Sequence, residues 1–134
     1  MNRESIIAVT LAVENEMYVR AASQCVARCM PLVHNAYEIC TGRRAPLLPL
    51  ITLQVNEWDL PEGKVGSYKL PNEVHPSEGI LTVHPEAFTG QKAPYWFVIA
   101  HELIHAFLGL DSESHQGDFV VIADELGIPE RYRD

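Results

Sequence analysis

The run APYWFVIAHELIHAFLGL, residues 93–110, constrains the fold of this chain more than any other segment. Its residues are apolar almost all round, which predicts a central helix that is buried on every side. Apart from Tyr95, its only ionisable groups are His101, Glu102 and His105. Burying a carboxylate and two imidazoles without partners costs several kcal/mol. A metal ion would pair with these groups naturally.

The same three residues form a His-Glu-x-x-His pattern. Residues four apart on a helix differ by about 40° in direction, so His101 and His105 can aim a ring nitrogen at one point. A catalytic zinc takes three protein ligands and leaves its fourth position to water. Glu102 lies on an adjacent flank, where it can accept the proton of that water as a general base. The plain alternative is a pair of buried histidines with structural partners.

A third ligand is sought in the C-terminal part of the chain. The last helix is expected to start near Ser114 or His115 and to end before Gly127. His115 shares one helical stripe with Phe119, so the apolar partner would carry the imidazole inward. We therefore predict His115 as the third ligand. The alternatives are Glu125 as runner-up, and Asp124, Asp111 and Glu113.

A small sheet is predicted between two helical regions. From about residue 4 to residue 40 the chain lacks Gly, which favours one or two helices, broken or kinked near Pro31. Three short strand candidates follow, at 50–55, at 64–70 and at 79–85. Together with the later helices they predict an α+β fold with a three-stranded, mainly antiparallel sheet.

Length and composition set the class of protein. A chain of 134 residues fits one domain, residues 1–134, and its formal net charge is −8. That charge does not support binding to nucleic acid. The N-terminal segment lacks the features of a signal peptide, and the sequence has no stretch of eighteen apolar residues. We expect a cytoplasmic protein that does not enter a membrane.

The three cysteines, Cys25, Cys29 and Cys40, favour the same compartment. An odd number without a CxxC pair argues against a disulfide framework and for a reducing environment. Cys25 and Cys29 are four residues apart and would share one helix face. We predict buried structural thiols there.

The segment HELIHAFLGLDSESHQGDF, with LGIP further on, resembles the SprT-like (Spartan-type) zinc metallopeptidases. VGSYKLPNEVHPSEGILTVHPEAF resembles a strand pair of the same family, and the likeness covers roughly residues 50–128. It implies a zincin-like fold in which a central helix carries His-Glu-x-x-His and a C-terminal helix carries the third ligand. It further implies one Zn²⁺ ion held by His101, His105 and His115, with Glu102 as the general base.

The expected activity is hydrolysis of peptide bonds in a protein or peptide substrate, although family members act on DNA-associated proteins. The strand GILTV, residues 79–83, is expected to form the sheet edge that holds an extended substrate. Two alternatives remain open: a non-catalytic or regulatory zinc-binding module, and a zinc hydrolase of a non-protein substrate. The candidates for stabilising the oxyanion are Tyr95, Tyr132, Arg131 and His84.

Overall fold

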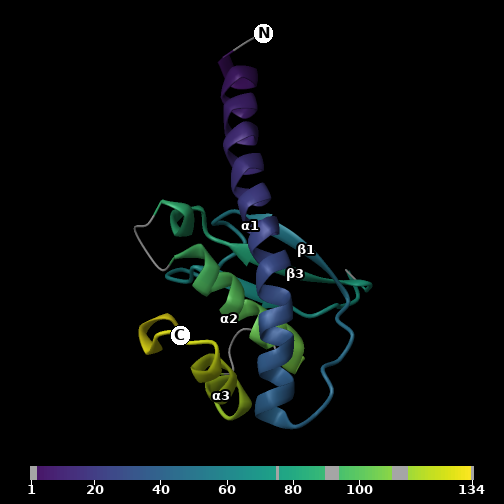
Figure 1. Cartoon of the computed structure of the whole chain (residues 1–134). Helices are drawn as coiled ribbons and strands as arrows, with labels where there is room; N and C mark the ends of the chain where they lie inside the picture. The colour runs from purple at the N-terminus through teal and green to yellow at the C-terminus, as the bar shows by residue number, and fades with distance from the viewer. Residues whose placement is uncertain (1–2, 75, 90–93, 110–114, 134) are drawn as a thin grey trace.

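Three helices and a small mixed sheet form an α+β fold (Figure 1). The computed structural model describes residues 3–74, 76–89, 94–109 and 115–133. The helices are α1 (Arg3–Thr41), α2 (Tyr95–Leu108) and α3 (Asp118–Glu125), and the strands are β1 (Leu50–Val55), β2 (Gly66–Lys69) and β3 (Glu78–Val83). Two short 3₁₀ helices are η1 (Pro85–Phe88) and η2 (Glu130–Tyr132).

Helix α1 is one continuous helix of 39 residues, although Pro31 lies inside it. Of the one or two helices expected, a single one is present, and it is not broken at this proline. Pro31 is exposed, so the carbonyl that loses its amide partner there is open to water. On the opposite face Cys29 and Val33 are buried against the core, which keeps the helix in one piece. Figure 1 shows the N-terminal part of α1 extending beyond the rest of the fold.

The prediction of buried thiols on one face of this helix is confirmed. Cys25 and Cys29 are both free and buried, and their sulfur atoms are 3.7 Å apart. Hydrogen bonding to Cys29 and burial raise the pKa of the Cys25 thiol far above its ordinary value.

Among the described residues, no helix combines the length and the apolar character needed to cross a membrane.

The sheet has the strand order β1-β3-β2, so β3 is its central strand. β1 pairs with β3 in parallel, with Leu50 opposite Glu78, and β2 pairs with β3 antiparallel, with Gly66 opposite Val83. The predicted strands are therefore present, but the sheet is mixed rather than mainly antiparallel. β3 has neighbours on both sides, so it cannot be the sheet edge expected of residues 79–83.

Helix α2 is buried as the sequence predicts. Every residue from Val98 to Phe107 is buried, and the helix packs against α1, β2 and β3. Pro94 is its N-cap, and Gly109 ends it in the left-handed conformation with φ at 68°. The core of the fold therefore surrounds the helix that carries the His-Glu-x-x-His pattern.

Helix α3 starts later than predicted. It begins at Asp118, after an N-cap glycine, Gly117, whose φ of 60° and ψ of −122° are not helical. His115 therefore lies three residues before the helix, not on it, and the expectation that the C-terminal helix carries this residue is wrong. Ser114, the other predicted start, lies outside the described residues. The predicted end before Gly127 is confirmed.

Gly66 brings β2 into close contact with α2. A side-chain Cβ built at this position would overlap Cγ1 of Val98 and would lie 3.5 Å from Cγ of Glu102. Only glycine therefore lets the strand approach the face of the helix that carries Val98 and Glu102 so closely.

We expect Gly66→Ala to lower the free energy of unfolding by about 1–3 kcal/mol, because the added methyl group forces strand and helix apart. In a Val98→Ala background, which removes the overlapping methyl group, the same substitution should cost clearly less. Urea denaturation of the four proteins measures both values. Equal costs in the two backgrounds would contradict this account of Gly66.

Candidate metal centre

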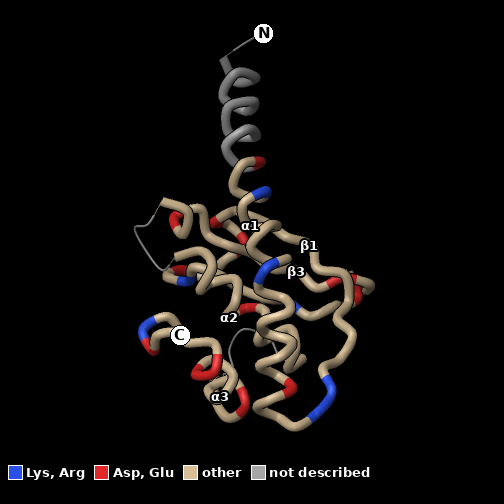
Figure 2. The backbone as a smooth tube through the Cα atoms, in the orientation of Figure 1, with Lys and Arg blue, Asp and Glu red and all other residues tan. Residues whose placement is uncertain are grey.

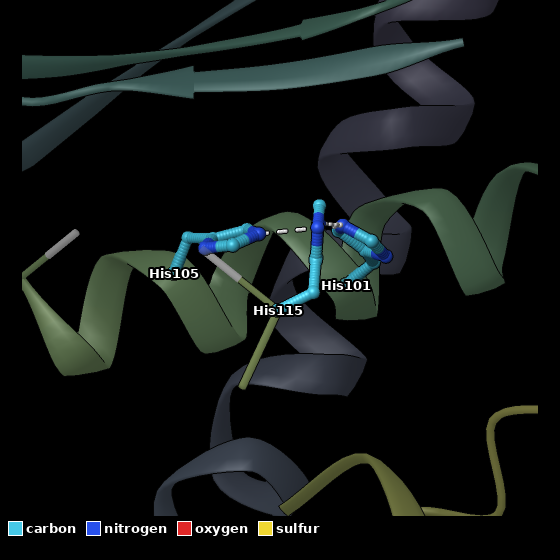
Figure 3. A group of neighbouring side chains, drawn as sticks. All are labelled: His101, His105 and His115. Carbon is cyan, nitrogen blue, oxygen red and sulfur yellow. Dashed lines mark hydrogen bonds between the residues drawn. The ribbon is translucent and has the colours of Figure 1, made fainter. Parts of the chain in front are cut away.

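Three imidazoles meet at one point in the structure. Figure 3 shows His101 and His105 extending from α2 and His115 from the segment before α3, with all three rings pointing toward one another. Nε2 of His101 is 2.9 Å from Nε2 of His115 and 3.3 Å from Nε2 of His105. One ligand atom from each residue lies within 4.8 Å of the others. These three residues are close enough to hold a metal ion.

The second ring nitrogen of His101 fixes how this ligand is presented. Its Nδ1 lies 3.1 Å from the carbonyl oxygen of Tyr132, which can only accept a hydrogen bond. Nδ1 must therefore carry the proton, and the lone pair of Nε2 is left for the metal side. Backbone from η2, near the end of the described chain, thus orients a ligand on α2.

His105 is the most deeply buried of the three, with no exposed surface. Burial first, and then the neighbouring His101 and His115, lowers its pKa from 6.5 to about 3. The ring is therefore neutral at physiological pH, which is the form that binds metal. Its Nδ1 is buried without a hydrogen-bond partner among the described residues. A buried polar atom without a partner lowers the stability of the fold, and such atoms are typical of functional sites.

A single aromatic ring supports all three imidazoles. The centroid of Phe119 lies 4.9 Å from that of His101, 4.8 Å from that of His105 and 5.0 Å from that of His115. Phe119 itself is fully buried at the start of α3. The sequence placed this ring in the core but gave no sign that it would contact every ligand.

His115 reaches the cluster by a route that differs from the predicted helical stripe. The residue has no regular secondary structure, and Gly117 turns the chain through a positive φ before α3 begins. The imidazole then stands at 62° to the ring of His101 and 72° to the ring of His105. The structure therefore brings His115 to the other two histidines, but not by the helical stripe that the sequence predicted.

Glu102 is buried beside the cluster, with 2% of its surface exposed. Its Oε1 lies 4.0 Å from Nε2 of His101, the nitrogen that faces the other ligands. The carboxylate therefore borders the three-histidine group and also lines the cleft described next.

The cluster opens into a cleft of about 910 Å³. One wall is β2 with the chain on either side of it, and the other is formed by α2, His115 and η2. Sequence reasoning missed the first wall, although the Gly-Ser pair at the start of β2 marks a strand without bulky side chains at two positions. The lining residues from this wall include Trp58, Lys64, Gly66, Ser67, Tyr68 and Lys69.

Some of the other candidate residues line the cleft and others do not. Arg131 and Tyr132 line the cleft, whereas Tyr95 and His84 do not, and His84 instead caps η1 through Nδ1. Glu125 is exposed and is not part of the three-histidine group. The remaining candidates are Asp124, which pairs with Arg133, and Asp111 and Glu113, which lie outside the described residues.

The geometry fits a metal ion. Where a zinc ion is bound tetrahedrally by imidazoles at about 2.0–2.1 Å, its ligand nitrogens lie about 3.3 Å apart. Two of the three separations, 2.9 Å and 3.3 Å, come close to that value, and all three ligand atoms lie within 4.8 Å of one another. Imidazole ligands suit zinc, copper, iron and nickel, so the donor set does not select one of them.

Comparisons with protein families, with curated proteins and with solved structures give no match to this chain.

We expect His115→Ala to weaken metal binding by roughly 100-fold or more, because even the loss of a hydrogen bond that supports a ligand costs roughly 10–100-fold. The control is His34→Ala, which removes an exposed imidazole from α1 and should leave binding unchanged. Elemental analysis after dialysis against a weak chelator measures metal per chain. Full metal content in His115→Ala would exclude this residue as a ligand.

Proposed function

We propose that this chain is a zinc metallopeptidase of the SprT-like type, with a zincin-like arrangement of the metal helix. The observation that carries the proposal is the buried carboxylate of Glu102 beside three converging imidazoles at the base of an open cleft. A metal kept only for folding needs neither a neighbouring base nor access from solvent. Zinc is proposed because three histidines with a glutamate base match its catalytic sites.

Each residue then has a distinct role. His101, His105 and His115 would hold the ion through their Nε2 atoms, with His101 oriented by the carbonyl of Tyr132. A bound zinc ion supplies Lewis acidity that activates water and polarises a carbonyl. A carboxylate oxygen of Glu102 takes the proton of the attacking water and later delivers it to the leaving amine.

An extended peptide suits the shape of the cleft. β2 lies at an edge of the sheet and lines the cleft. It would therefore hold the substrate in place of residues 79–83, which were expected to do so. Main-chain pairing along such an edge holds a peptide with little dependence on its side chains. Arg131 and Tyr132 are the two remaining candidates for stabilising the oxyanion, because they line the same cleft.

A reducing, intracellular compartment completes the proposal. Cys25, Cys29 and Cys40 are all free thiols. Free cysteines in this number are typical of proteins that work in the cytoplasm.

We expect Glu102→Gln to lower the rate of cleavage of an unfolded protein by roughly 100-fold to 10,000-fold, because an amide cannot take the proton of the water. Zinc content should stay the same, since Glu102 is not a ligand. Glu125→Gln, an equal change at an exposed position on α3, should retain both activity and zinc.

Two results would contradict the proposal. Cleavage that survives in Glu102→Gln would exclude this residue as the base. A wild-type protein that retains zinc but cleaves no unfolded protein would favour a non-catalytic zinc-binding module or a hydrolase of a non-protein substrate.

A further inference from the structure

The cleft carries more positive charge than the rest of the chain leads one to expect. Lys64, Lys69 and Arg131 line it, and all three side chains are exposed. Among the described residues, the carboxylates that line it are those of Asp59 and Glu102. The chain as a whole has a net charge of −8, with ten basic residues against eighteen acidic ones.

The three cations of the cleft differ from those arginines elsewhere that form ion pairs. Outside the cleft, Arg20 pairs with Glu16, Arg43 with Asp118 and Arg133 with Asp124. Among the described residues, no carboxylate pairs with Lys64, Lys69 or Arg131. The guanidinium of Arg131 instead lies over the ring of Tyr132, 4.8 Å from its centroid.

The acidic groups within the cleft do not neutralise these cations. Asp59 accepts a hydrogen bond from the side chain of Asn56 at 3.1 Å, and its own amide donates to Asn56 at 3.0 Å, so it is held within its turn. Glu102 is buried next to the metal ligands. The positive charge at the rim therefore faces whatever enters.

The positions of the two lysines match a chain bound along β2. Lys69 is the last residue of the strand, and Lys64 lies two residues before its first, Gly66. A peptide paired along this edge would pass one lysine on each side of the strand's centre.

Figure 2 shows charged residues on several elements, with a blue stretch just beyond the C-terminal end of α1, so positive charge is not confined to the cleft.

We propose that the cleft selects peptides that carry acidic side chains close to the scissile bond, with Lys64, Lys69 and Arg131 as the recognising groups. This inference rests on the proposed peptidase function and names its substrate class. The net charge of −8 does not oppose it at physiological salt, because the Debye length of about 8 Å screens the remote carboxylates while the cations at the rim are in contact with the substrate.

Binding to the zinc-loaded Glu102→Gln protein tests the inference without any need for hydrolysis. Three fluorescently labelled peptides of one length are compared by anisotropy, differing only in whether two central positions are Glu, Gln or Lys. The Glu peptide should bind most tightly, and its advantage should shrink as salt is raised. Equal binding of the three peptides, or tighter binding of the Lys peptide, would overturn the inference.

Charge reversal locates the effect. Lys64→Glu combined with Lys69→Glu should weaken binding of the Glu peptide by roughly tenfold, since two exposed ion pairs become repulsive contacts. The control is Arg28→Glu combined with Arg44→Glu, which reverses two exposed charges outside the cleft and should leave binding unchanged. A loss of equal size in this control would show that only the net charge matters and would overturn the assignment to the cleft.

Two further results separate this inference from the proposed function. Cleavage in which kcat/KM is equal for Glu and Lys peptides would leave the peptidase proposal intact and overturn the selectivity. A labelled oligodeoxynucleotide that binds more tightly than the Glu peptide, and loses binding in the double lysine variant, would assign the cleft to a phosphate backbone and overturn the peptide class.

Discussion

The meeting of three imidazole nitrogens in the interior is the constraint on which the arrangement of the other elements depends. Two of them are supplied by one helix because their spacing is four residues, but the third must come from a different part of the chain. α2 is accordingly buried on all sides, α3 starts directly after the segment that delivers His115, and η2 lies where its backbone orients His101. The packing of the small domain serves to bring these distant pieces together.

The centre of the fold was predictable from the sequence because the relevant signals are local. Apolar residues on every side predicted a buried α2, and the spacing of His101 and His105 predicted their common direction. His115 was expected to point inward with Phe119, and its imidazole does lie beside those of His101 and His105. The start of α3 was placed too early because the φ and ψ of Gly117 could not be read from its identity alone.

The sheet was harder because strand pairing depends on contacts between residues far apart in sequence. The positions of the three strands were predicted from the sequence, but their order and directions in the sheet were not. β2 lies on the far side of β3 and does not pair with β1. One signal in β3 favoured the central position. Five of its six residues are buried, which corresponds to the nearly unbroken apolar run GILTV, typical of a strand covered on both faces.

The ring of Phe119 has a thermodynamic consequence for metal binding. A flexible histidine loses rotational freedom when an ion captures it, and this loss subtracts from the affinity. Here the three imidazoles already rest on one buried ring and on each other, so most of that entropy is given up when the chain folds. An ion bound at this cluster would meet imidazoles that are already packed in place, so less of the free energy of coordination would be offset by ordering them.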